Sequence, residues 1–213
     1  MNEEQLKAMA SQLSCPTGED GILTADMMHF SNIGMTRNTI NALTLAAQDR
    51  VLELGHGNGH HIPEILSTTE NISYYGLEIS ELMNKEASLF NKEAQASFML
   101  YDGENIPFEA NYFNKIMTVN TLYFWKNPVY LLNEIYRVLQ PAGKFVCTFA
   151  EKAFMEKLPF TKFVFELYDR AKIKVLIQST AFKKVEFQEH TEQITSKDGQ
   201  SIERNYTVAI FEK

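Results

Sequence analysis

The sequence predicts an α/β protein: a three-layer sandwich whose mostly parallel, seven-stranded sheet ends in an antiparallel hairpin. From position 51, short β-rich runs alternate with helical segments. Near the end of the 213-residue chain, two strand-like runs flank Asp198-Gly199, which is a hairpin signal. Alternating strands and helices are typical of a parallel sheet covered on both faces, which binds ligands at the carboxyl ends of its strands.

The first 47 residues are expected to form a helical cap, with helices over 2–13, 25–30 and 35–47. A turn-rich stretch from Ser14 to Gly18 separates the first two helices. The composition shows no linker or repeat that would divide the chain. We therefore expect one domain over 1–213, made of the cap (1–47) and a core (48–213).

The core elements follow in order along the chain. The expected strands are 51–54, 72–77, 98–101, 115–119 and 144–149, and the hairpin strands are 184–189 and 205–211. Helices are expected up to about Ser67, from an N-cap at Ser80 to about Gln95, and in about 152–178. Another helix should begin at Asn127-Pro128 and end at the turn 141–143.

Composition excludes several classes of function. The chain has 20 Lys+Arg against 27 Asp+Glu, a net charge of −7, which argues against nucleic-acid binding. No apolar run approaches the roughly 18 residues of a membrane span, and the acidic N-terminus is unlike a signal peptide. Two sparse cysteines, Cys15 and Cys147, lack metal-site spacing and indicate a reducing compartment. We expect a cytoplasmic protein.

The most informative motif is Glu53-Leu54-Gly55-His56-Gly57-Asn58-Gly59, which follows a strand and opens a helix. Glycine permits positive φ and close approach of a ligand to the backbone. Nicotinamide-binding folds use G-x-G-x-x-G/A, whose sixth position is a small residue. Here His60 occupies that position. The motif therefore favours a different nucleotide-like ligand.

Over roughly residues 20–150, the chain resembles the class I S-adenosylmethionine-dependent methyltransferases. The subgroup it resembles most is the small-molecule one similar to ubiquinone/menaquinone-biosynthesis methyltransferases. The segments that carry the resemblance are 53–59, 75–80, 101–108, 120–124 and 137–143. It implies a Rossmann-like fold, S-adenosylmethionine as cofactor with S-adenosylhomocysteine as product, and an activity of the EC 2.1.1 type. The chain departs from the family pattern at Asn114 and Ala142.

The resemblance assigns cofactor contacts to the ends of the strands. It implies that Glu78 holds the ribose, that Asp102 with the Gly103 amide lies beside the adenine, and that Asn120 meets the amino-acid part or the substrate. Glu53 orients the loop or meets the methionine amino group, with a buried structural role equally open. The complete set of expected cofactor residues is Glu53, Gly55, His56, Gly57, Asn58, Gly59, Glu78, Ile79, Asp102, Gly103 and Asn120.

No catalytic residue is fixed by the sequence. His29, His60 and Tyr123 are candidates for a general base, and Asn32 and Tyr123 for contacts to the acceptor. His56, His60 and His61 cluster in the chain without further ligands at suitable spacing, so no metal is expected. An aromatic group after the third and fourth strands lines an apolar pocket or belongs to the core: Tyr101, Tyr123, Phe124 and Trp125.

The expected function is transfer of a methyl group from S-adenosylmethionine to a small, partly apolar acceptor by in-line displacement. Two alternatives remain open: a non-catalytic scaffold that binds the cofactor, and a nicotinamide-dependent oxidoreductase. The expected partner is the small-molecule acceptor, with no nucleic acid and no membrane span. The acceptor, the methylated atom and the choice between monomer and homodimer are left open by the sequence.

Overall fold

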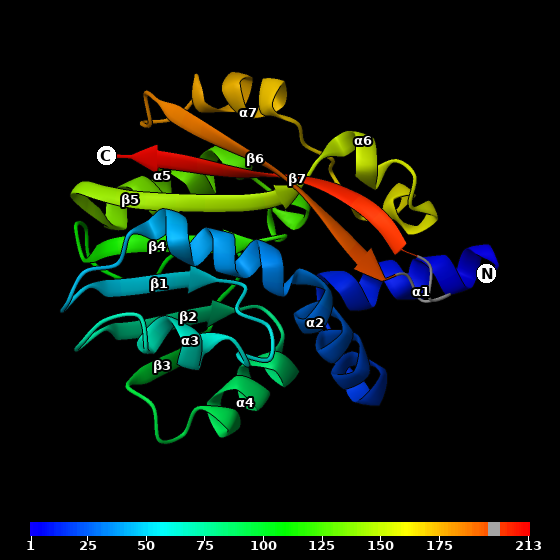
Figure 1. The fold of residues 1–213 in the computed structure, drawn as a ribbon, viewed down its shortest axis with the longest axis horizontal. Helices are drawn as coiled ribbons and strands as arrows, with labels where there is room; N and C mark the ends of the chain where they lie inside the picture. The colour runs from blue at the N-terminus through cyan, green and yellow to red at the C-terminus, as the bar shows by residue number, and fades with distance from the viewer. Residues whose placement is uncertain (196–200) are drawn as a thin grey trace.

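The computed structural model describes residues 1–195 and 201–213, and the strands in this part of the chain form one seven-stranded sheet (Figure 1). The strand order is β3-β2-β1-β4-β5-β7-β6. The strands are β1 (Arg50–Leu54), β2 (Ser73–Glu78), β3 (Ala96–Leu100), β4 (Phe113–Val119), β5 (Leu139–Ala150), β6 (Val185–Thr195) and β7 (Ser201–Glu212).

The sheet is parallel from β3 to β5 and antiparallel at β7 and β6. The central strand β1 is buried on both faces, with Val51, Leu52 and Leu54 fully inaccessible. A continuous apolar run of this kind is typical of a parallel strand covered by helices on both sides. The predicted seven-stranded sandwich with an antiparallel end is therefore confirmed. Asp198-Gly199, predicted as the hairpin turn, lies outside the described residues.

Helices cover both faces of this sheet (Figure 1). The second half of α2 packs over β4 and β5, and α5 packs against β5 from the opposite face and contacts α7. The helices are α1 (Glu3–Ser14), α2 (Gly18–Leu43), α3 (Ile62–Leu66), α4 (Glu81–Phe90), α5 (Pro128–Val138), α6 (Lys152–Met155) and α7 (Arg170–Ile177), with short 3₁₀ turns η1 (Leu122–Phe124) and η2 (Pro159–Lys162).

The prediction of two separate helices over 25–30 and 35–47 is wrong, because α2 runs without a break from Gly18 to Leu43. The gap between the two predicted helices contains the polar residues Ser31 and Asn32. In the structure, Arg204 of β7 binds the Ser31 carbonyl and the Asn32 side chain. A contact from 172 residues away along the chain thus accommodates the polar residues within the helix.

Two helix ends also differ from prediction, and so does the helical content of residues 152–178. Helix α4 ends at Phe90 instead of near Gln95, because the buried amide of Asn91 donates to the carbonyls of Gly59 and Ala87. Helix α5 ends at Val138 and not at the turn 141–143, because Leu139 already pairs with Phe113 as part of β5. In 152–178, only α6, η2 and α7 are helical.

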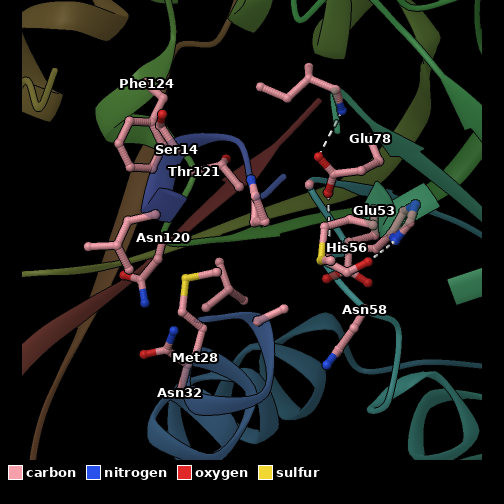
Figure 2. A pocket seen from close by; sticks show the side chains of 18 of the residues that line it. Ser14, Met28, Asn32, Glu53, His56, Asn58, Glu78, Asn120, Thr121 and Phe124 are labelled. Atoms are coloured by element: carbon pink, nitrogen blue, oxygen red, sulfur yellow. Dashed lines mark hydrogen bonds between the residues drawn. The ribbon is translucent and has the colours of Figure 1, made fainter. Parts of the chain in front are cut away.

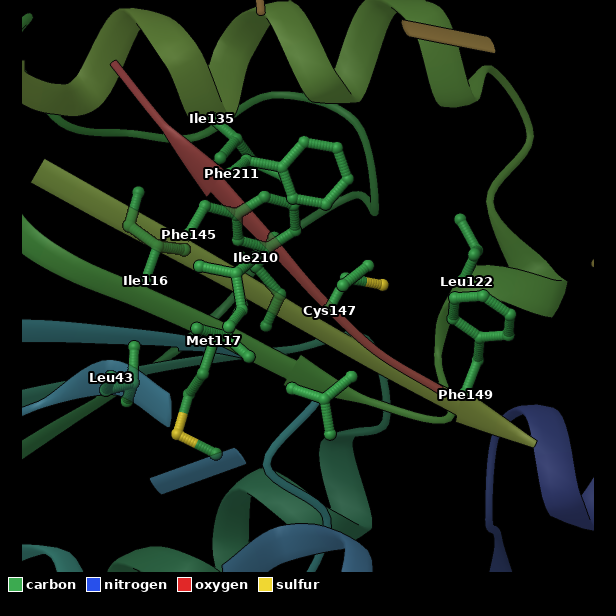
Figure 3. Packing of buried hydrophobic residues seen from close by; sticks show 14 of the residues in the cluster. Leu43, Ile116, Met117, Leu122, Ile135, Phe145, Cys147, Phe149, Ile210 and Phe211 are labelled. Carbon is green, nitrogen blue, oxygen red and sulfur yellow. The ribbon is translucent and has the colours of Figure 1, made fainter. Parts of the chain in front are cut away.

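One part of the hydrophobic core lies between the sheet and α5, where aromatic side chains from β5 and β7 meet (Figure 3). The rings of Phe145 and Phe211 stack at 5.1 Å between centroids, and both are essentially inaccessible. Burying one such side chain stabilises the fold by roughly 1.5–3 kcal/mol. Cys147 lies in this core, and burial raises the pKa of its thiol. Among the described helices, none has both the length and the apolar character needed to cross a membrane.

Candidate active site

A cavity of about 170 Å³ lies at the carboxyl ends of the parallel strands (Figure 2). Its walls come from the loops that follow β1, β2, β3 and β4, from the inner side of α2, and from the segment joining α1 to α2. This is the edge where parallel α/β sheets bind ligands. The N-terminal helices therefore contribute to the same cavity as the glycine-rich loop.

The glycine-rich loop after β1 needs glycine for two different reasons. Gly55, Gly57 and Gly59 have φ values of +73°, +58° and +71°, in the region that other residues rarely adopt. A Cβ at Gly55 would lie 2.4 Å from Thr121 Cγ2, whereas a Cβ at Gly57 would meet nothing within 4 Å. Gly55 is thus required by packing as well as by φ, and Gly57 leaves open space for a ligand.

This difference predicts a graded loss of stability. Alanine at Gly57 carries only the backbone strain, about 1–2 kcal/mol, whereas alanine at Gly55 adds the clash with Thr121. We expect Gly55→Ala to lower the free energy of unfolding more than Gly57→Ala, measured by urea denaturation. Adding Thr121→Ser, which removes Cγ2, should bring Gly55→Ala close to Gly57→Ala. Equal losses in the two single variants would contradict this account.

Glu78, the last residue of β2, turns its carboxylate towards the cavity (Figure 2) and is 6% exposed. Its Oε1 accepts hydrogen bonds from the amides of Ile79 (2.8 Å) and Ser80 (3.0 Å), and its Oε2 accepts one from the Gly57 amide (3.0 Å). A carboxylate has about four acceptor positions. Glu78 therefore fixes the glycine loop and retains an acceptor position for a ligand hydroxyl.

His56 is buried beside this carboxylate. Its Nδ1 lies 2.8 Å from the Gly57 carbonyl, which can only accept, so Nδ1 carries the proton and Nε2 is an acceptor. Burial lowers the pKa of His56, despite the opposing charges of Glu78 and Glu53. Within the described residues, Nε2 has no hydrogen-bond partner. Gly76 makes room for the ring, since a Cβ there would lie 2.4 Å from His56 Cδ2.

Glu53 forms a buried ion pair with His61 at the cavity wall. His61 Nε2 lies 2.8 Å from Glu53 Oε2, which also accepts from the Tyr74 hydroxyl at 2.6 Å. Burial opposes ionisation of Glu53, but the His61 charge and both hydrogen bonds outweigh it and lower the pKa of Glu53. Burial likewise disfavours charge on His61, yet Glu53 raises its pKa. These contacts give Glu53 a structural role at the base of the loop.

The pair predicts a pH-dependent contribution to stability. The raised pKa of His61 stabilises the fold fully below the ordinary histidine pKa, and this contribution is lost as pH rises through the folded value. The lowered pKa of Glu53 stabilises above the ordinary glutamate pKa and is lost as pH falls through the folded value. The difference in unfolding free energy between wild type and His61→Gln should be greatest between about pH 4.5 and about pH 6.5. A difference that stays constant into the alkaline range would contradict the assignment.

The loop after β3 supplies another wall. Tyr101 and Gly103 of this loop line the cavity beside Ile79 from the loop after β2, whereas Asp102 does not line it. The Asp102 carboxylate accepts from the amides of Glu104 (2.8 Å) and Asn105 (2.7 Å). The hydrogen bonds from Asn105, above all its backbone one, lower the pKa of Asp102 to about 2. Its proposed contact to adenine stays a prediction.

Asn120 lines the cavity at the end of β4, and Tyr123 lies behind it. Asn120 has φ +58°, which asparagine tolerates better than most residues. The Tyr123 hydroxyl donates to Asn120 Oδ1 (3.0 Å) and accepts from the Ala150 amide (2.6 Å). Burial raises the pKa of Tyr123. The structure does not bring Tyr123 to the cavity as a base or acceptor contact, because its hydroxyl is engaged in the core.

Of the two histidines predicted as candidate general bases, His29 lines the cavity and His60 does not. Burial first, and then the charges of His61 and His60, lower the pKa of His29. The His60 ring packs between His29 and Phe90, at centroid distances of 5.4 and 4.3 Å. His29 is therefore a mostly neutral imidazole facing the cavity.

Helix α2 is tied to the glycine loop by a further contact. Asn58, a cavity-lining residue of the loop, donates from Nδ2 to Asp26 Oδ1 of α2 at 3.0 Å. No group of three or more metal-ligating side chains is found among the described residues.

Comparison with known proteins agrees with this architecture. Residues 52–147, from β1 into β5, match the family described as a methyltransferase domain. Residues 52–147 are therefore a methyltransferase domain of the class I, S-adenosylmethionine-dependent type. Over 122 residues, this methyltransferase is 29% identical to the uncharacterized methyltransferase YdaC of Bacillus subtilis, a match that covers 57% of this chain and 67% of YdaC.

Solved structures show the same Rossmann-like fold for this methyltransferase. The YcgJ protein of Bacillus subtilis has a TM-score of 0.70 at 16% identity, covering 87% of this chain and 99% of that one. Phosphoethanolamine N-methyltransferase 2 of Haemonchus contortus, solved with phosphomonomethylethanolamine and S-adenosylhomocysteine, has a TM-score of 0.70 at 15% identity. That match covers 90% of this chain but 57% of the nematode enzyme, and it shows the fold alone.

Several residues that line the cavity were not among the contacts predicted from the sequence. Ser14, Pro16, Met28 and Thr121 line the cavity. The segment at Pro16 is held in place by the Ser80 hydroxyl, which donates to the Pro16 carbonyl at 2.6 Å. Contacts of this kind join segments distant in sequence, so local motifs could not have predicted them.

Proposed function

We propose that this chain transfers the methyl group of S-adenosylmethionine to a small, partly apolar acceptor. The observation that supports this proposal most is the hydrogen bond from the Gly57 amide to Glu78 at the edge of the cavity. It joins the glycine loop and the acid after β2 into one cofactor-sized recognition surface. The S-adenosylhomocysteine in the nematode N-methyltransferase structure is consistent with this cofactor.

The residues present fit the cofactor. Glu78 has an acceptor position left for a ribose hydroxyl, and Gly57 has open space where a side chain would stand. Ile79, Tyr101 and Gly103 would flank the adenine. When bound, the cofactor supplies an already activated methyl group, so the protein mainly has to position the acceptor.

The acceptor would bind on the side formed by α1, α2 and the loop after β4. Apolar side chains from three elements face the cavity there: Leu13, Met28, Phe124 and Trp125. These residues would exclude water and hold the acceptor in line with the methyl group, and such orientation can contribute roughly 7–11 kcal/mol to catalysis. His29 is the candidate that could accept a proton, since it is mostly neutral and faces the cavity.

Other expectations from the sequence stay predictions. These are the ubiquinone/menaquinone-like subgroup, the single-domain organisation with a cap over 1–47, the cytoplasmic location, and the choice between monomer and homodimer. The non-catalytic scaffold is the alternative to separate from an enzyme. The cavity includes an acceptor side and is not filled by side chains, which favours the enzyme.

The test is acceptor-dependent formation of S-adenosylhomocysteine. Wild-type protein is incubated with S-adenosylmethionine and a panel of phenol, quinol, carboxylate and amine fragments. We expect product formation with at least one acceptor, and a lower rate in His29→Asn if that acceptor must lose a proton. Cofactor binding without product across the panel would favour the scaffold.

A further inference from the structure

Arg204 of β7 is a buried charge that the proposed chemistry does not use. It is 5% exposed, and its guanidinium donates to Glu192 Oε1 from Nε (2.9 Å) and Nη2 (2.6 Å). Nη2 also donates to the Ser31 carbonyl (2.5 Å), and Nη1 donates to Asn32 Oδ1 (2.8 Å). The C-terminal hairpin thus reaches the part of α2 that lines the cavity.

The Arg204 contact fixes which end of the Asn32 amide faces the cavity. A guanidinium can only donate, so Asn32 must turn Oδ1 towards Arg204 and Nδ2 away from it. Asn32 lines the cavity, and among the described residues its Nδ2 donates to no partner. Arg204 therefore orients Asn32 as a hydrogen-bond donor.

Asn120 is oriented in the same sense by different neighbours. Its Oδ1 accepts from the Tyr123 hydroxyl (3.0 Å) and the Ala150 amide (3.4 Å), which leaves Nδ2 as the free end. Within the part of the chain that the structure describes, that nitrogen makes only a weak contact, 3.4 Å, with Met35 Sδ. In Figure 2 the amide nitrogens of Asn32 and Asn120 are the ends of the two side chains that face one another, opposite Glu78.

A glycine inside α2 indicates that this arrangement is built into the sequence. A Cβ at Gly34 would lie 2.3 Å from Glu192 Oε2. Glycine is unfavourable in a helix interior, and here it makes room for the carboxylate that holds Arg204. Because Glu192 balances the charge of Arg204, the two amides face the cavity as dipoles and not as a net charge.

We propose that Arg204 is a positioning residue and that Asn32 and Asn120 form a two-donor subsite for the methyl acceptor. The subsite binds a carbonyl or carboxylate oxygen, because both exposed groups donate and neither accepts. This inference rests on the proposed function, since it assigns the amides to the acceptor and not to the cofactor. It narrows the acceptor to molecules that carry such an oxygen beside an apolar body.

The experiment titrates three fragments of one shape, benzoate, acetophenone and benzylamine, into protein saturated with S-adenosylhomocysteine, followed by NMR. The key variant is Asn32→Asp, which still accepts from Arg204 but cannot donate. Asn38→Asp is the matched control, because Asn38 lies on the same helix, does not line the cavity, and bonds the Tyr206 hydroxyl. Arg204→Met tests the positioning role by releasing Asn32.

We expect benzoate or acetophenone to bind wild type more tightly than benzylamine, and Asn32→Asp to weaken them about fivefold or more, as for one lost hydrogen bond. Acetophenone carries no charge. A loss of acetophenone affinity in Asn32→Asp would therefore report the missing hydrogen-bond donor and not charge repulsion. Arg204→Met should weaken the same fragments, with affinity for S-adenosylhomocysteine unchanged in every variant.

Three results would contradict the proposed two-donor subsite. They are fragment affinities unchanged in Asn32→Asp, a preference for benzylamine, or a loss of S-adenosylhomocysteine affinity in place of fragment affinity. The last would assign the amides to the cofactor's own carboxylate. If wild type bound no S-adenosylhomocysteine, the proposed function would fail separately, and the fragments titrated alone would still test the subsite.

Discussion

Glu78→Gln is expected to weaken binding of S-adenosylhomocysteine about tenfold or more, since a charged hydrogen bond contributes roughly 1.5–3 kcal/mol. The Glu78 carboxylate accepts from the amides of Gly57, Ile79 and Ser80. A carboxamide has one acceptor oxygen, and its NH₂ group would face an amide that also donates. The variant should therefore lose both the contact to the ribose and the anchor of the glycine loop.

The measurement is isothermal titration calorimetry with S-adenosylhomocysteine on wild type, Glu78→Gln and Glu81→Gln. Glu81 is the matched control because it is an exposed glutamate three residues away, at the start of α4. Circular dichroism would verify that the variants are folded. If folded Glu78→Gln bound S-adenosylhomocysteine as tightly as wild type does, the assignment of Glu78 to the cofactor site would be wrong.

His61→Leu is expected to lower the free energy of unfolding by about 3–5 kcal/mol, the usual cost of leaving one member of a buried ion pair without its partner. Glu53 is 2% exposed and, among the described residues, would keep only the Tyr74 hydroxyl as a side-chain partner. Adding Glu53→Gln, which removes the buried charge while keeping an acceptor for Tyr74, should recover part of the loss.

The matched control is the exposed pair of Arg37 and Glu64, whose closest atoms are 2.9 Å apart. Arg37→Gln should cost about 1 kcal/mol or less, because water screens an exposed pair. Urea denaturation near pH 6 would compare the variants. Similar losses for His61→Leu and Arg37→Gln would show that the buried pair contributes no more than a surface one.

The fold could be predicted wherever local pattern and tertiary environment agree. The strands of the core follow apolar runs bounded by turn residues, and the structure confirms each of them. The continuous α2 could not be predicted, because Ser31 and Asn32 are satisfied by Arg204, which lies far away in sequence. The early end of α5 likewise depends on Leu139 pairing with Phe113.

The residues of the candidate site also fall into a group that the sequence predicts and a group that depends on the tertiary fold. Residues of the glycine loop and Glu78 were predicted from local motifs, and the structure places them on one cavity, except Gly59, which packs against Ala87 and Asn91 of α4 and its C-cap. Partners chosen by the fold were not predictable, such as His61 for Glu53 and Arg204 for Asn32. Tyr123 was predicted to line the pocket because it is an aromatic residue after β4. In the structure it is buried behind Asn120.

The most direct test of the central claim is calorimetric titration of the wild-type chain with S-adenosylmethionine, S-adenosylhomocysteine and NAD. The account predicts that both sulfur compounds bind at one site per chain and that NAD does not bind. Binding of NAD with no binding of S-adenosylmethionine or S-adenosylhomocysteine would contradict it, and would mean that the cavity between the glycine loop and Glu78 serves a nicotinamide cofactor.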